Sequence, residues 1–191
     1  MSSAADGVGA WTIPGIVRRM VPLLAALSVL ELGSGLVLDT YAAFLAEYRV
    51  LAVLVPVMIG TGGNLGAILS ARLSTRLHLG TLSFDPRDPV LWVDVLATLA
   101  LAATVFGVTG LAAFAIGHLL GEPMGLVDLL VISLGSGMLL ALVASGLSIG
   151  ATYASYRFGV DPDETTIPVV TNVTDVLGVV ILFAVALTVL R

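Results

Sequence analysis

Residues 50–71 form the sequence VLAVLVPVMIGTGGNLGAILSA, a run of 22 residues without one charged side chain. A helix needs about 20 predominantly apolar residues to cross the hydrocarbon core of a bilayer. This stretch is therefore long enough and apolar enough to span a membrane. Two more charge-free runs, of 23 and 28 residues, occupy positions 95–117 and 129–156.

Two further apolar stretches differ from these three only because they contain acids. Residues 21–46 hold Glu31 and Asp39, and residues 167–190 hold Asp175. The first stretch has no small-residue cleavage site after a short apolar core, so we expect it to be retained rather than removed as a signal peptide. The sequence therefore predicts an all-α membrane protein with five transmembrane helices.

The composition supports this class and excludes several others. Of the 191 residues, 58% are hydrophobic and 11% are charged, and the mean hydropathy is +1.10. Soluble domains carry about 25% charged residues. The net charge of −5 argues against a nucleic-acid partner, and the absence of cysteine excludes disulfides and thiolate metal sites.

The arginines predict the orientation of the five spans. Cytoplasmic loops of membrane proteins carry the excess of basic residues. Five spans place six arginines on one side of the bilayer and two on the other, and the six are Arg18, Arg19, Arg72, Arg76, Arg87 and Arg157. We therefore expect a cytoplasmic N-terminus, an outside C-terminus and a multi-pass protein of the cell membrane. Residues 1–13 are predicted to be a flexible arm and residues 14–191 a single five-helix domain.

Asp175 is the residue least expected in its surroundings. A lone acid near the bilayer centre costs about 2.5–3.5 kcal/mol on insertion scales, and such residues usually mark a transport path. At 100° per residue, Thr171, Asn172 and Asp175 share one helical face. Pro168 removes a backbone donor one turn earlier, so we expect carbonyls near residues 164–171 to be free to face an ion.

A carboxylate, an amide oxygen and free carbonyls make a hard-oxygen site. Such a site suits Mg²⁺, Ca²⁺ or Mn²⁺ rather than Zn²⁺ or Cu⁺. The alternative is that Asp175 is neutralised by a proton or a partner and only holds the helices together.

The second span carries Pro56 followed by GTGGNLG at residues 60–66. The glycines and the proline are expected to loosen a helix at mid-membrane, which is tolerated where the backbone is buried or lines a cavity. Asn64 would offer an oxygen there. Close helix packing through glycine explains the same pattern equally well.

The remaining acids divide into two groups. Glu31 and Asp39 are separated by a net rotation of about 80°, so both could face an ion path, or they could only cap the bundle. Acids at span ends cost little, and Asp94, Glu122 and Asp128 are interpreted in that way. Residues 161–164 form an acidic turn, either simply solvated or attracting cations to a mouth.

Two motifs together resemble one known family. Residues 55–66, VPVMIGTGGNLG, resemble the second-helix signature of MgtE-type magnesium transporters. Residues 159–175, GVDPDETTIPVVTNVTD, resemble the start of the fifth helix in that family, with its Asp-Pro, Pro, Thr and pore aspartate. Residues 69–80, LSARLSTRLHLG, are closer to eukaryotic solute carrier family 41, which carries two copies of this domain. The likeness covers residues 14–191.

This resemblance implies a Mg²⁺ pathway at the two-fold interface of a homodimer of five-helix units. It implies that Asp175 holds hydrated Mg²⁺, that the Thr171 carbonyl faces the ion and that Asn64 lies near the pore. Gly62 and Gly63, in the same signature, are expected to line the path. A glutamine usually follows the glycine-asparagine core, and here Ile68 takes its place.

Three functions are compared on these grounds. The first is a Mg²⁺ channel or transporter, in which Asn172 would join Asp175, Thr171 and Asn64 at the metal. The second is a Na⁺- or H⁺-coupled Mg²⁺ exchanger that uses Glu31 and Asp39 for coupling. The third is a structural membrane subunit. An enzyme is not expected, because no span holds a histidine beside a paired aspartate.

Overall fold

The computed structural model describes residues 12–83, 85, 87–122 and 124–191. The described residues form helices and connecting turns, without a β-strand. The helices are α2 (Ile13–Thr40), α3 (Ala42–Glu47), α4 (Arg49–His78), α5 (Pro89–Leu119), α6 (Leu126–Phe158) and α7 (Pro162–Val189). Most of the expected N-terminal arm lies outside the described residues, and α2 begins at Ile13.

Local sequence signals mark where several helices begin and end. The Thr12 hydroxyl accepts a hydrogen bond from the Gly15 backbone N–H, and the Asp88 carboxylate accepts one from Val90. Such side chains satisfy donors that the first helical turn leaves unpaired. Gly159 ends α6 with φ at +67°, a left-handed conformation that glycine adopts without steric cost.

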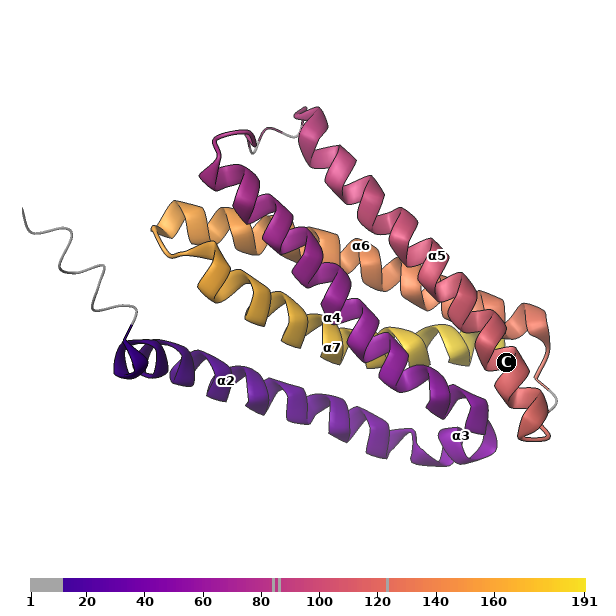
Figure 1. Ribbon diagram of the computed structural model, residues 1–191. Helices are drawn as coiled ribbons and strands as arrows, with labels where there is room; N and C mark the ends of the chain where they lie inside the picture. Colours follow the sequence, from indigo (N-terminus) through magenta and orange to yellow (C-terminus); the bar gives the residue numbers. More distant parts are fainter. Residues whose placement is uncertain (1–11, 84, 86, 123) are drawn as a thin grey trace, which may run out of the picture.

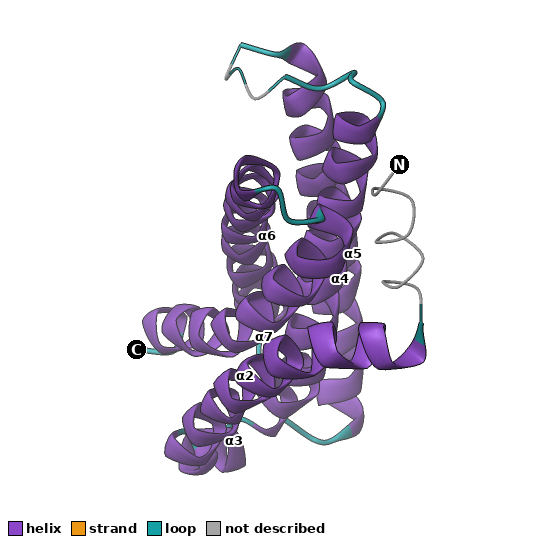
Figure 2. Cartoon of the chain, turned by 90° about the vertical axis from the view of Figure 1, so that its left-hand side faces the viewer, coloured by secondary structure: helices purple, strands orange, loops and turns teal. Residues whose placement is uncertain are grey.

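Four long helices form the packed body of the protein. The closest packing joins α4 with α7, followed by α6 with α7 and α5 with α6. Figure 1 shows α4, α6 and α7 crossing one another, with α5 along the far side of α6. Figure 2 shows α7 and α2 side by side at an angle to the other helices.

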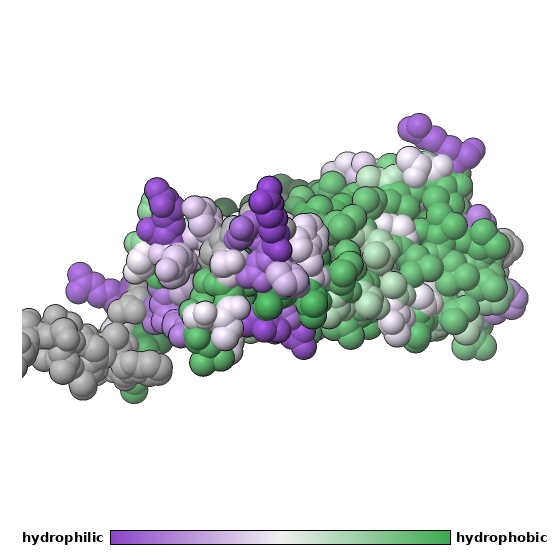
Figure 3. Space-filling view, turned by 90° about the horizontal axis from the view of Figure 1, so that it is seen from above, coloured by the Kyte–Doolittle hydropathy of each residue, from purple (hydrophilic) through white to green (hydrophobic). Residues whose placement is uncertain are grey.

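The prediction of an all-α membrane protein with five apolar helices is confirmed. All the helices except α3 are long and apolar enough to cross a membrane, with mean hydropathies of 1.7 to 2.3 in their most apolar windows. Figure 3 shows the apolar residues as a broad band, with the hydrophilic side chains concentrated towards its ends. The helices α4, α5 and α6 each extend beyond the charge-free run that predicted them.

The first span differs from the stretch expected at residues 21–46. The helix α2 starts earlier and ends at Thr40, and the chain turns at Tyr41 before the short helix α3. The Tyr41 ring stacks on Phe183 of α7, with ring centroids 4.4 Å apart. This contact ties the turn to the body of the protein.

Small residues allow the long helices to approach closely. A Cβ on Gly66 would lie 2.5 Å from Cγ1 of Val170, and one on Gly137 would overlap the Phe106 side chain. Serine hydroxyls bridge the same helices: Ser148 Oγ donates to the Gly66 carbonyl at 3.0 Å. Transmembrane helices associate through this kind of close packing and interhelical hydrogen bonding.

The helix α2 is attached to this body more loosely than any other span. Only 6% of its most apolar window is buried, against 22–44% for the other four. Its contacts run to α7 and α3. Its exposed apolar side chains, which include Leu24, Leu32 and Leu36, are therefore available to lipid or to another protein surface.

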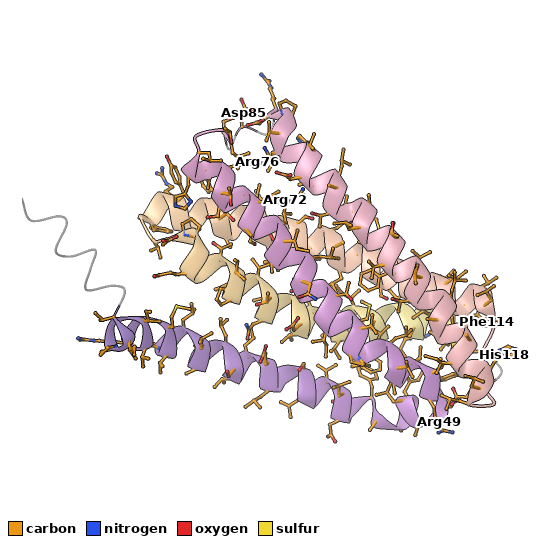
Figure 4. All side chains as sticks on the ribbon, viewed as in Figure 1. Arg49, Arg72, Arg76, Asp85, Phe114 and His118 are labelled. Carbon is orange, nitrogen blue, oxygen red and sulfur yellow. The ribbon has the colours of Figure 1, made fainter. Side chains whose placement is uncertain are left out.

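The helix ends that carry arginines lie at the two ends of the molecule in the way that five spans predict. The start of α2, the end of α4, the start of α5 and the end of α6 lie at one end of the molecule, where Figure 4 labels Arg72 and Arg76. Arg49 lies at the opposite end. The cytoplasmic location of the arginine-rich end stays a prediction.

We expect Gly137→Ala to destabilise the protein, because the added methyl has no space against the buried Phe106 ring. Overpacking of this kind costs about 1–3 kcal/mol. The control is Gly146→Ala in the same helix, where a Cβ meets nothing within 4 Å. Thermal unfolding in detergent should show a lower midpoint for Gly137→Ala and an unchanged or higher one for the control. Equal midpoints for the two variants would contradict the close α5–α6 contact.

Candidate functional site

The carboxylate of Asp175 lies in the contact between α7 and α4. A Cβ built on Gly63 would be 2.7 Å from Asp175 Oδ1, so this glycine leaves the space that the carboxylate occupies. Asp175 is half-buried. Its Oδ1 is buried and accepts no hydrogen bond from the part of the chain that the structure describes. A buried oxygen without a donor is costly, so this atom is suited to receive a cation, a proton or water.

A second carboxyl group, on α2, lies within electrostatic range of Asp175. Glu31 is half-buried and near enough to Asp175 for the two charges to interact. Asp39, two turns further along α2, is exposed. The structure therefore places Glu31 near Asp175, whereas Asp39 lies at the C-terminal end of α2.

The polar residues that precede Asp175 bond to their own helix. Thr171 Oγ1 donates to the Ile167 and Pro168 carbonyls at 2.9 and 3.1 Å, and Asn172 Nδ2 donates to the Pro168 carbonyl at 2.8 Å. The carbonyls at positions 167 and 168 are thus occupied, contrary to the expectation that they would be free. The Asn172 amide oxygen has no such partner among the described residues.

The Thr171 carbonyl is also engaged. Thr174 Oγ1 donates to it at 2.9 Å and to the Val170 carbonyl at 2.7 Å. A carbonyl oxygen carries two lone pairs, and inside a helix it also accepts the backbone N–H four residues further along, so both lone pairs of the Thr171 carbonyl are engaged within α7.

The glycine-rich stretch of α4 is an unbroken helix rather than a loosened one. Gly62 packs on Leu140 of α6, Gly63 on Asp175 and Gly66 on Val170 of α7. Close packing is therefore the correct interpretation of these glycines, because their missing side chains admit three neighbouring groups. Of the two glycines expected on the path, only Gly63 adjoins the carboxylate.

Asn64 lies on the opposite, open face of the same helix. Its side chain is exposed and makes no hydrogen bond to a described residue. Ala52, Pro56 and Gly60 share this exposed face, and a Cβ on Gly60 would meet nothing within 4 Å. An amide in hydrocarbon would lack partners, so this face is suited to protein or water rather than to lipid.

The described part of one chain does not provide a carboxylate or histidine cluster for a metal ion. Within the described ranges, no three His, Asp or Glu side chains come together as metal ligands. The histidines lie elsewhere: the His118 ring packs on Phe114 at 4.5 Å, and His78 Nδ1 lies 3.0 Å from the Ser74 carbonyl. The side chain of Asp163 in the acidic turn lies outside the described residues.

Asp94 is a polar residue whose role the sequence interpretation missed. It is fully buried rather than solvated at a span end. Its Oδ1 accepts hydrogen bonds from Arg72 at 3.1 Å and Arg76 at 3.3 Å, and its Oδ2 lies 2.6 Å from Arg76 Nε. The two arginines one turn apart in LSARLSTR were the available signal, because such a pair can hold one buried acid.

Glu122 has a similar structural role at the opposite end. Its carboxylate accepts hydrogen bonds from the backbone N–H groups of Arg49 and Val50 at 3.1 and 2.9 Å. It therefore caps the start of α4 from the loop between α5 and α6, an arrangement that no local pattern predicts.

Comparison with known proteins identifies related sequences. Residues 55–185 match the profile of the MgtE family, described as a divalent cation transporter. This range contains Gly63, Asn64 and Asp175, and it covers more than half of the chain.

Curated relatives belong to solute carrier family 41. Human solute carrier family 41 member 2 is 28% identical over 172 residues, covering 87% of this chain and 30% of the relative. Rat solute carrier family 41 member 3 is 27% identical over 166 residues, covering 84% of this chain and 36% of the relative. The chain therefore spans about a third of the length of the relatives it matches.

We expect Gly63→Ala to destabilise the α4–α7 contact through Asp175, because the new methyl would lie 2.7 Å from its Oδ1. Gly60→Ala, one turn earlier on the open face, is the matched control. The effect should shrink in an Asp175→Ala background, with a coupling of about 0.5–3 kcal/mol, as expected for two residues in contact. Unfolding in detergent measures all four variants of the cycle. Additive effects would contradict the contact between Gly63 and Asp175.

Proposed function

Because the chain belongs to the MgtE family of divalent cation transporters, we propose that it carries Mg²⁺ across the cell membrane along a path lined by Asp175. The observation that carries this proposal is the buried Oδ1 of Asp175, which has no donor among the described residues. An acid within an apolar span is costly unless something compensates its charge. A divalent cation supplies that compensation.

The oxygen donors around Asp175 favour a hard cation that keeps its water. The Asn172 amide oxygen lies within one turn of the carboxylate on α7, and the Thr171 carbonyl lies on the same turn. Mg²⁺ loses water reluctantly and is usually held by one or two carboxylates through several retained waters. We assign Asp175 the charge and Asn172, Thr171 and Asn64 the ordering of the bound water.

The same proposal includes a homodimer with the ion path at its two-fold interface. The open face of α4 carries Ala52, Pro56, Gly60 and Asn64, whereas the exposed face of α5 carries large apolar side chains such as Trp92, Leu96, Val108 and Leu111. The α5 face suits lipid, and the small, polar α4 face suits a second copy. In an isologous interface each carboxylate has a symmetry-related twin.

Two carboxylates near one axis repel each other, so one of them would tend to take up a proton in the absence of a cation. A divalent ion between them removes the repulsion. The absence of a three-carboxylate or histidine cluster within the described residues of one chain fits a site that is completed by a partner. The arginine-rich end is proposed to face the cytoplasm.

A coupled exchanger is the second candidate, and one observation favours it. Glu31 interacts with Asp175 from the loosely packed α2, so a proton or Na⁺ on Glu31 would change the charge that Mg²⁺ meets. Purified protein in liposomes distinguishes the two functions. A channel passes Mg²⁺ under a membrane potential alone, whereas an exchanger also requires a Na⁺ or H⁺ gradient.

We expect Asp175→Asn to abolish Mg²⁺ uptake while the protein still folds, because the amide keeps the shape of the carboxylate and removes its charge. Uptake into liposomes measures transport, and calorimetric titration should lose a site of about one ion per two chains. Asp128→Asn, at the start of α6, is the control and should behave as the unmodified protein.

Retained uptake by Asp175→Asn would remove the central proposal. The non-transport alternative, a structural membrane subunit, predicts that neither variant changes Mg²⁺ flux, because no flux would depend on the chain.

A further inference from the structure

A groove of about 520 Å³ lies along the last two turns of α4, at the arginine-rich end of the molecule. Its lining does not include Asp175, and it lies about two turns or more beyond Asn64 along α4. The residues that line it are Ala71, Arg72, Thr75, Arg76, Leu79 and Thr81.

The two arginines of this groove are held in place by one buried acid. The buried carboxylate of Asp94 bonds to both guanidinium groups, while their side chains remain 53% and 36% exposed. Each guanidinium has five N–H donors, so the two arginines have ten between them, and Asp94 uses only a few of these. The others are available in a fixed geometry, which reduces the entropy that binding a ligand would cost.

The hydroxyl groups and nearby acids leave the arginines open to a ligand. Thr75 and Thr81 donate to the Ala71 and Arg76 carbonyls, so neither hydroxyl competes for the guanidinium groups. The Asp88 carboxylate accepts hydrogen bonds from the backbone and the hydroxyl of Ser83, which lower its pKa and hold it within the loop, and the charge of Arg76 lowers that pKa further. Asp94 itself is fully buried.

The position of the groove specifies the kind of ligand. It lies where the apolar band ends, because α4 is a membrane span and its last turn carries Arg76 and His78. Leu79, which lines the groove, is 71% exposed. Figure 4 shows Arg72 and Arg76 beside the loop that joins α4 to α5, at this boundary. A ligand here would contact both charge and hydrocarbon.

We propose that this groove holds an anionic phospholipid, with its phosphate on Arg72 and Arg76 and its acyl chain against Ala71 and Leu79. Guanidinium groups recognise phosphate through paired N–H donors, and basic pockets at the ends of membrane helices bind anionic headgroups. The bound lipid would brace the end of α4, the helix that carries Gly63 and Asn64. This proposal does not depend on which ion the protein transports.

The test measures lipid retained by the full chain. Protein in detergent is mixed with phosphatidylglycerol, with phosphatidylcholine, or with phosphatidylglycerol plus excess inorganic phosphate, and the lipid adducts are counted by native mass spectrometry. Phosphatidylglycerol should be retained in preference to phosphatidylcholine, and inorganic phosphate should not displace it. Arg72→Gln should lower retention about fivefold, the effect of one basic side chain at a membrane surface.

Two further variants separate the site from folding and from general charge. Thr75→Glu adds a negative charge beside the arginines without touching the Asp94 bonds, and it should also reduce retention. Arg18→Gln removes an exposed arginine of α2 and should change nothing. Unchanged retention in Thr75→Glu and Arg72→Gln, equal retention of the two lipids, or displacement by inorganic phosphate would each overturn the proposal.

Discussion

The contact between Gly63 and Asp175 is the constraint on which the rest of this structure depends. Any side chain at position 63 would occupy the space of the carboxylate, so α4 and α7 meet at the depth of the acid only because one of them has no Cβ there. The surrounding glycines continue the same close approach along α4 and bring α6 into it. The helix contact that stabilises the body thus also positions the charge proposed to attract the ion.

The molecule has two kinds of buried acid, and their surroundings give them different roles. Asp94 is fully enclosed and paired with two arginines, an arrangement that joins α4 to α5 and compensates the charge of the acid. Asp175 is half-enclosed, has an acid rather than a base as its neighbour, and keeps an oxygen without a donor. Both acids are removed from water, but the sign of the neighbouring charge differs, and this difference supports the proposal that Asp175 rather than Asp94 binds the ion.

The sequence predicted the five spans, because apolar length is a property of each segment alone, and it singled out Asp175 because an acid in such a segment is conspicuous. It did not predict the Asp94 pairing or the Glu122 cap, since both join residues that are distant from each other in the sequence. The turn at Tyr41 was also missed, because it is accompanied by stacking on Phe183, more than a hundred positions away. Hydrophobic periodicity describes one helix at a time, whereas these three contacts join segments that are distant in the sequence.

The separation of Glu31 from Asp175 along the chain has a consequence for biosynthesis. Their helices are the first and the last of the five spans to leave the ribosome, and α2 has few other contacts to hold it. Glu31 therefore enters the bilayer before its neighbour on α7 exists, and it must be accommodated by water, a proton or the translocation machinery until α7 has been made. Packing of α2 on α7 therefore has to wait until the four later spans have been synthesised.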